Sequence, residues 1–112
     1  MKSATGPPFE VAQPYDTVIN ALPEVLTGAS LKVQAVDPAS GVVQAKRSMS
    51  MGSYGDNITV QLGASGPAAT SCTVRSEVVY GLIDFGHSKR QVKKVTDTIV
   101  AAFGGAPPPP TG

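Results

Sequence analysis

The stretch "TSCTVRSEVVYGLIDFGHSKRQVKKVTDTIVAAF", residues 70–103, decides the fold, because its hydrophobic period changes from that of a strand to that of a helix. Over residues 70–80, Cys72, Val74 and Ser76 alternate with polar side chains such as those of Arg75 and Glu77. This pattern is typical of a strand with one buried face. Over residues 88–103 the apolar positions recur at helical spacing, and a Gly-Gly pair follows. A long strand followed by an amphipathic helix is predicted.

Short apolar runs before residue 70 predict the remaining strands. "FEVA" at residues 9–12, "SLKVQAVDP" at 30–38, "VVQAKRSMS" at 42–50 and "ITVQL" at 58–62 are each bounded by turn-forming residues. In the second run Leu31, Val33 and Ala35 alternate with Lys32 and Gln34. The turn "DPASG" joins that run to the next, so these two strands are expected to form a hairpin.

A first helix is predicted over "DTVINALPEVLTGA", residues 16–29. Asp16 is the expected N-cap and Gly28 is expected just past the end, while Pro23 should kink or restart the helix. One helical face carries apolar side chains at the spacing expected of a core-facing helix, namely Val18, Leu22, Val25 and Leu26.

The resulting order is strand, helix, four strands, helix. It predicts one α+β domain over residues 9–104, a two-layer sandwich with both helices on one face of an antiparallel sheet. This order resembles the TATA-box-binding-protein-like fold, a similarity of topology that implies no function. Residues 1–8 are predicted to be a flexible N-terminus and residues 105–112, with their four prolines, a disordered tail.

Size and composition exclude several function classes. The chain has 112 residues, so Asp84-Phe85-Gly86 cannot be the magnesium motif of a kinase domain, which also needs an HRD loop. A net charge of +1 is too small to attract nucleic acid or an acidic membrane through the overall electrostatic field of the protein. Neither a spanning apolar run nor a signal-peptide core is found, which predicts a cytoplasmic protein or the soluble part of an anchored one.

One motif resembles a known family. Its residues are Arg75-Ser76, Gly81, Asp84, Gly86 and Arg90 with Val92, in the spacing RS-x4-G-x2-D-x-G followed by a basic helix. The pattern resembles the signature of a large uncharacterised family of bacteria and plastids, one of the numbered domains of unknown function, over residues 74–95. The resemblance implies a fold and leaves the activity open.

The motif also has a purely structural interpretation. Gly81 and Gly86 flank a strand-to-helix connection, where Asp84 is positioned to accept backbone N–H bonds or to pair with Arg75. Ser88 is the natural N-cap of the last helix. On this interpretation the motif residues only shape the connection between the strand and the helix.

The start of the last helix is unusually basic. Lys89, Arg90, Lys93 and Lys94 occupy its first two turns, where the macrodipole is positive and like charges repel at i,i+4. With Ser88 they form a candidate anion site for a phosphate, an acidic peptide, an anionic lipid headgroup or a nucleic-acid backbone. An aromatic content of 5% without tryptophan disfavours nucleic acid, and a simply solvated basic face is the alternative.

A second candidate surface is the loop "SMSMGSYGDN". Met49, Met51 and Tyr54 lie among serines and glycines, a setting in which methionines form adaptable partner contacts. Alternatively, Met49 and Met51 fill the edge of the core.

Little in the sequence supports catalysis. His87 is the only histidine and Cys72 the only cysteine, so neither a zinc site nor a disulfide is expected, and no cofactor is predicted. The leading prediction is a non-enzymatic interaction module that contacts a partner through the basic helix start or the methionine loop. The alternative is a small-ligand binder that holds an anionic group at the helix start and an apolar body against the sheet. An enzyme using His87 or Cys72 is the third hypothesis.

Overall fold

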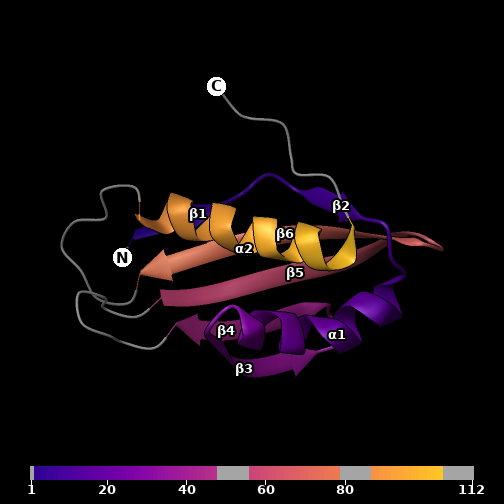
Figure 1. Cartoon of the computed structure of the whole chain (residues 1–112), viewed down its shortest axis with the longest axis horizontal. Helices are drawn as coiled ribbons and strands as arrows, with labels where there is room; N and C mark the ends of the chain where they lie inside the picture. The colour runs from indigo at the N-terminus through magenta and orange to yellow at the C-terminus, as the bar shows by residue number, and fades with distance from the viewer. Residues whose placement is uncertain (1, 48–55, 79–86, 105–112) are drawn as a thin grey trace.

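The computed structural model describes residues 2–47, 56–78 and 87–104 of the chain. Within these residues the strands form one six-stranded antiparallel sheet in the order β1–β6–β5–β4–β3, and β2 also pairs with β6. The two helices pack on one face of the sheet, which confirms the predicted α+β architecture (Figure 1). In chain order the elements are β1 (Lys2–Thr5), β2 (Phe9–Val11), α1 (Tyr15–Gly28), β3 (Leu31–Asp37), β4 (Val42–Arg47), β5 (Asp56–Gly66), β6 (Ala69–Val78) and α2 (His87–Phe103).

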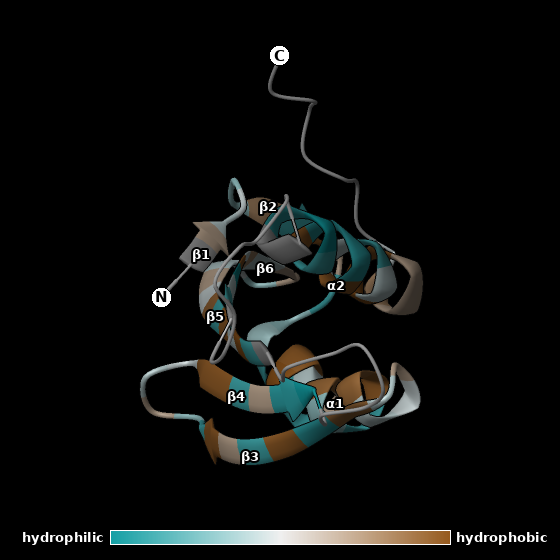
Figure 2. Cartoon of the chain, turned by 90° about the vertical axis from the view of Figure 1, so that its left-hand side faces the viewer, coloured by the Kyte–Doolittle hydropathy of each residue, from teal (hydrophilic) through white to brown (hydrophobic). Residues whose placement is uncertain are grey.

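The core lies between the sheet and the two helices. Strand alternation places Val60 and Leu62 of β5, and Cys72 and Val74 of β6, on the helix-facing side, where all four are buried. Helix α2 lies over β6 and β1, while α1 lies mainly over β3 (Figures 1 and 2). Each fully buried aliphatic side chain contributes about 1.5 to 3 kcal/mol, so this layer accounts for most of the favourable free energy of folding.

Helix α1 begins at Tyr15, two residues earlier than the predicted N-cap at Asp16 implies. Its N-cap is Pro14, in an extended conformation with no side-chain cap, so the prediction of Asp16 as N-cap is wrong. Asp16 lies in the first turn instead, where a carboxylate complements the helix dipole. The helix runs through Pro23 without restarting, and Gly28 is its last residue rather than the residue after its end.

The N-terminal residues belong to the sheet. Lys2–Thr5 form β1, which pairs with β6 from Lys2 opposite Val78 to Thr5 opposite Arg75. The prediction of a flexible segment over residues 1–8 is therefore wrong for this strand. The Gly6 N–H then donates to the Val74 carbonyl over 2.9 Å, and a Cβ on Gly6 would lie only 2.7 Å from Val92 Cγ1 of α2. A glycine at this position lets α2 pack closely against the sheet edge.

Strand β3 forms one edge of the sheet, and a bulge interrupts it. The register shifts between Val33 and Ala35, so Ala35 faces the exposed side with Gln44 rather than the core. The prediction that Leu31, Val33 and Ala35 all face the same side of the sheet is therefore wrong for Ala35. In β4 the buried Val43 and Ala45 alternate with the exposed Gln44 and Lys46.

The β3–β4 turn is held by several hydrogen bonds. Asp37 Oδ1 accepts from the backbone N–H groups of Ala39 and Ser40, and hydrogen bonds from Ser40 lower the pKa of the Asp37 carboxyl. Gly41 adopts a φ of 76°, in the left-handed region that favours glycine. The Tyr15 hydroxyl donates to the Pro38 carbonyl over 2.6 Å, which ties the start of α1 to this turn.

Among the described residues, neither helix is long and apolar enough to cross a lipid bilayer.

Candidate functional site

A groove of about 120 Å³ runs between the end of α1 and the middle of α2. Three separate parts of the chain line it: the turn from α1 into β3, the last residue of β4, and one side of α2. We call this the interhelical groove, and its lining residues are Ala29, Ser30, Leu31, Arg47, Gln91, Lys94, Val95 and Thr98.

Strand alternation places Arg47 in the groove. Val43 and Ala45 of β4 are buried on the helix-facing side, and Arg47 follows with the same parity. Its partner across the strand pair is Leu31, which is also buried. Arg47 is half-buried and forms no ion pair with a described residue. A guanidinium group is therefore held on the apolar side of the sheet without a described counter-charge.

A tight turn at the end of α1 forms the opposite wall. The Ala29 N–H donates to the Leu26 carbonyl over 3.0 Å, and the Ser30 N–H donates to the Thr27 carbonyl over 3.1 Å. Ser30 has a φ of 68°, which turns the chain sharply into β3. These carbonyls of α1 already have backbone partners, so they do not require donors from the groove. The last turn of α1 contains no basic residue.

Gln91 is the buried polar group of the site. The residue as a whole is 6% exposed, and its side chain forms no hydrogen bond with the described residues, but its carboxamide atoms are not among the buried polar atoms that lack a partner and so remain open to solvent. Since Gln91 lines the interhelical groove, a molecule in that groove is in position to form a hydrogen bond with the Gln91 carboxamide in place of water.

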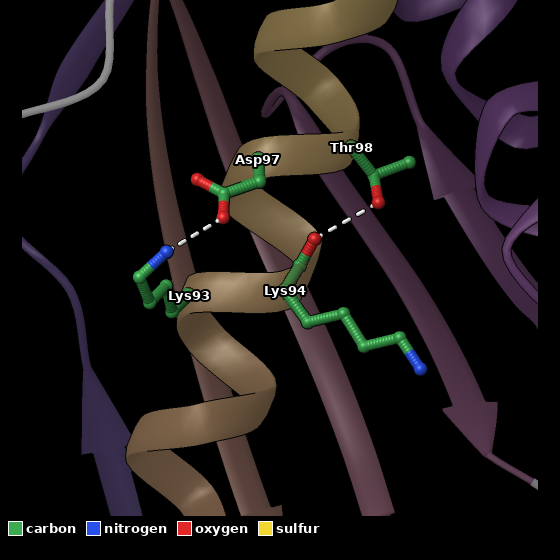
Figure 3. Close-up of polar contacts among 4 residues, drawn as sticks. All are labelled: Lys93, Lys94, Asp97 and Thr98. Carbon is green, nitrogen blue, oxygen red and sulfur yellow. Dashed lines mark hydrogen bonds and ion pairs between the residues drawn. The ribbon is translucent and has the colours of Figure 1, made fainter.

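Lys93 and Lys94 lie on different sides of α2 (Figure 3). Lys93 Nζ contacts Asp97 Oδ2 at 2.9 Å, whereas the Lys94 side chain points away from this pair and lines the groove. Thr98 Oγ1 donates to the Lys94 backbone carbonyl over 2.9 Å, which leaves the Lys94 ammonium group outside that bond. Lys94 is exposed and forms no ion pair within the described part of the chain.

The structure thus divides the basic residues predicted at the start of the last helix. Lys89 and Arg90 are exposed on the first turn, Lys93 is paired with Asp97, and Lys94 belongs to the interhelical groove. Helix α2 already includes His87, so the prediction of Ser88 as its N-cap is wrong, and the side chains of His87 and Ser88 lie outside the described part of the chain. An anion site at the helix start itself stays a prediction.

The two described residues of the RS motif lie on opposite faces of β6. Arg75 is on the exposed face, where its guanidinium lies 3.4 Å from the Glu77 carboxylate. Ser76 is fully buried on the helix side, and its hydroxyl has no hydrogen-bond partner. Gly81, Asp84 and Gly86 lie outside the described residues, and so do Met49, Met51 and Tyr54 of the methionine loop.

Cys72 is a core residue, as predicted. It is fully buried in β6, and burial raises the pKa of its thiol to about 12. The thiol is therefore protonated near neutral pH and is not an activated nucleophile. No group of three metal-binding side chains occurs among the described residues.

A second hollow, of about 250 Å³, lies on the exposed face of the sheet. Gln34, Gln44 and Asn57 in its lining are exposed, and Gln34 Nε2 already donates to the Lys32 carbonyl. It also lacks a basic lining residue. The interhelical groove, in contrast, is lined by two cations and a carboxamide that has no hydrogen bond to a described residue, and we regard it as the candidate functional site.

Sequence reasoning identified Lys94 but missed Arg47 and Gln91. A signal for Arg47 was present, because it continues the inward parity of Val43 and Ala45. Gln91 lies beside the apolar stripe of α2, where its spacing alone does not distinguish a buried from an exposed position. That these residues lie together follows from the tertiary fold.

No family model and no curated protein matches this chain. Among solved structures, the chain is similar to the Zhui aromatase/cyclase from Streptomyces sp. R1128, with a TM-score of 0.54 and 13% sequence identity. The similarity covers 92% of this chain and 86% of that one. At this identity it shows a shared fold alone, and the resemblance to the uncharacterised family stays a prediction.

Proposed function

We propose that this protein binds a small anionic ligand in the interhelical groove. The observation that carries the proposal is that two cations, Arg47 and Lys94, line the same groove and form no ion pair with a described residue. An anionic ligand supplies the counter-charge for both cations, and the Gln91 carboxamide in the same lining is available to bond with it. The apolar side chains of Leu31 and Val95 provide the remaining contact surface.

This proposal shifts the site predicted at the helix start by about one turn along α2. The anion is then held by side chains from two layers of the fold rather than by the helix terminus. Arg47, at the end of β4, supplies the half-buried charge, and Lys94 supplies the exposed one. Half-burial strengthens the contribution of Arg47, because less water screens its charge.

Binding rather than catalysis is favoured by the chemistry of the lining. The groove contains no carboxylate, thiol or imidazole among its lining residues, so it lacks the side chains that usually act as a general base. Its hydroxyls belong to Ser30 and Thr98, and that of Thr98 is engaged with a backbone carbonyl.

The test is an amide NMR titration of isotopically labelled protein with sodium acetate and with sodium phosphate. We expect saturable shifts in the amides of Ser30, Leu31, Gln91 and Lys94. Uniform small shifts that never saturate, from both salts, would overturn the proposal.

A matched pair of variants makes the titration specific. Lys94→Gln and Lys93→Gln remove the same charge from adjacent positions of α2, yet only Lys94 lines the groove. We expect Lys94→Gln to weaken binding about threefold to tenfold and Lys93→Gln to leave it nearly unchanged. Equal effects would mean that the anion responds only to net charge.

A second candidate function is a docking surface for an acidic protein partner on the first turns of α2. Lys89 and Lys93 are exposed on one side of the helix, at i,i+4 spacing. A poly-glutamate peptide is a suitable probe, with Lys89→Gln together with Lys93→Gln as the disrupting change. Binding that persists in this double variant would remove the surface from consideration.

A further inference from the structure

The basic residues of the chain are gathered at one end of the molecule, although the net charge is only +1. Those in the sheet lie between the pair of Arg47 and Asp56, at the end of β4, and the pair of Arg75 and Thr59. Those in α2 lie in its first half, and Lys94 shares the lining of the interhelical groove with Arg47. We call this region the basic end, and its nine members are Lys2, Lys32, Lys46, Arg47, Arg75, Lys89, Arg90, Lys93 and Lys94.

The opposite end carries acidic residues and none of the nine basic ones. Glu10 of β2 pairs with β6 near the β5–β6 turn. Asp16 lies in the first turn of α1 and Asp37 lies at the β3–β4 turn. The hydrogen bond from the Tyr15 hydroxyl to the Pro38 carbonyl holds these two segments together. The net charge of +1 therefore conceals a separation of charge along the strands.

The cations of the basic end belong to both layers of the fold. Lys46 lies on the exposed face of the sheet, because its neighbours Ala45 and Arg47 are on the helix side. Lys32 is the direct partner of Lys46 on β3. Lys89 is exposed on the first turn of α2. Figure 2 looks onto this end and shows hydrophilic residues along the start of α2 and at the end of β4. The positive charge thus spans the thickness of the molecule instead of following one face.

Part of this charge has no fixed counter-charge. Lys32 and Lys46 are exposed and repel each other across the strand pair, and neither forms an ion pair with a described residue. The next residue in this row of the sheet is the neutral Asn57. Glu77 follows Asn57 in the row, but it is paired with Arg75, whose guanidinium lies 3.4 Å away. An anionic surface placed against the two lysines would replace a repulsion with two attractions.

A flat anionic surface fits this distribution better than a strand-like polyanion. A plane that meets the molecule end-on contacts the cations of both layers at once, whereas an acidic peptide or a nucleic-acid strand follows one line. The described aromatic residues, Phe9, Tyr15 and Phe103, lie toward the opposite end, so the described part of the basic end provides no stacking platform for bases. We infer that the basic end docks on a membrane surface that contains anionic lipid. This contact goes beyond the proposed function, because it does not require an anion in the interhelical groove.

The experiment measures binding of the intact protein to vesicles by cosedimentation. Vesicles of phosphatidylcholine alone are compared with vesicles that also contain phosphatidylserine, at low and at physiological ionic strength. Each lysine or arginine near an anionic bilayer favours the bound state about fivefold, and the attraction fades beyond a Debye length. We expect binding to the phosphatidylserine vesicles only, and weaker binding at the higher ionic strength.

Lys32→Gln together with Lys46→Gln is the diagnostic variant, because both lysines are exposed and lie outside the groove lining. We expect it to bind phosphatidylserine vesicles at least about tenfold more weakly than the wild-type protein. A further variant adds Glu10→Gln and Asp16→Asn at the opposite end, which restores the net charge of +1 while the basic end stays depleted. It should bind as weakly as the double variant. Amide spectra of the free variants establish that the fold is retained.

Three results would overturn the membrane contact. The first is equal binding of the wild-type protein to the two kinds of vesicle. The second is recovery of binding in the variant with restored net charge, which would mean that only the total charge matters. The third is binding of poly-glutamate or of a single-stranded oligonucleotide that survives to higher ionic strength than vesicle binding, which would assign the basic end to that partner instead. None of these results bears on the interhelical groove, since Lys32 and Lys46 do not line it.

Discussion

Lys93 and Asp97 form an ion pair across one turn of α2, with 2.9 Å between Nζ and Oδ2, outside the lining of the interhelical groove. Both side chains are largely exposed. The order of the pair, lysine before aspartate, is the less favourable one relative to the helix dipole. The pair thus lowers the free charge of the basic helix start while contributing little stability.

Removal of this ion pair tests that estimate. We expect Asp97→Asn to reduce the free energy of unfolding by no more than about 0.5 kcal/mol, and less at high salt. Urea unfolding at two ionic strengths measures the effect. A loss above about 1.5 kcal/mol that is insensitive to salt would contradict it.

Gly41 and Gly63 provide a matched pair for backbone constraint. Gly41 has a positive φ, and a Cβ there would lie close to the Leu62 carbonyl oxygen, so Gly41→Ala is expected to cost at least about 2 kcal/mol. Gly63 has no atom within 4 Å of an added Cβ. Gly63→Ala should therefore change the unfolding free energy by less than about 1 kcal/mol in either direction, as measured in urea.

Removal of the buried hydroxyl groups of Ser76 and Thr70 in β6 is expected to have opposite effects on stability. Both residues are fully buried, but Thr70 Oγ1 donates to the Gln13 carbonyl over 2.8 Å, whereas the Ser76 hydroxyl has no partner. We expect Thr70→Val to cost about 1 to 3 kcal/mol and Ser76→Ala to be neutral or stabilising by up to about 1 kcal/mol. Thermal unfolding of both variants gives the comparison, and a clear loss of stability in Ser76→Ala would mean that its hydroxyl has a partner in solution.

We expect the protein to lose stability at high pH because the Cys72 thiol is buried. Its pKa is raised from 9.0 to about 12 in the folded protein, so burial disfavours the thiolate. The stabilising contribution is complete below about pH 9 and is lost as the pH rises toward 12. Cys72→Ala should flatten the decline in unfolding free energy over this range relative to wild type. Parallel slopes for the two proteins, or rapid reaction of the native thiol with an aromatic disulfide reagent, would contradict the buried state.

The layers of this fold are predictable from its sequence, because they follow from local periodicity. Ile58, Val60 and Leu62 alternate as a half-buried strand must, and Val95 and Ile99 follow the helical period. Strand β1 has no comparable pattern. Its residues are ordered by pairing with the edge of β6, a tertiary interaction that a short polar segment does not reveal.

The site was less predictable than the fold. Lys94 was part of a basic run in the sequence, but the groove also needs Arg47 from β4 and the turn at Ser30. These residues meet only after α1 and α2 pack side by side on the same face of the sheet. The bulge after Val33 was likewise not predictable, because the alternation of side chains along a strand does not reveal where its register with the neighbouring strand shifts.

Strand β3 also bears on how the protein behaves in concentrated solution. A flat edge strand is a template for intermolecular β-pairing and aggregation, since its outer backbone groups are unpaired. Here the bulge between Val33 and Ala35 disrupts the regular spacing of those groups, and the charge of Lys32 precedes it on the same strand. An incoming strand would have to match this irregular edge and desolvate a lysine, so β3 opposes the growth of a continuous intermolecular sheet.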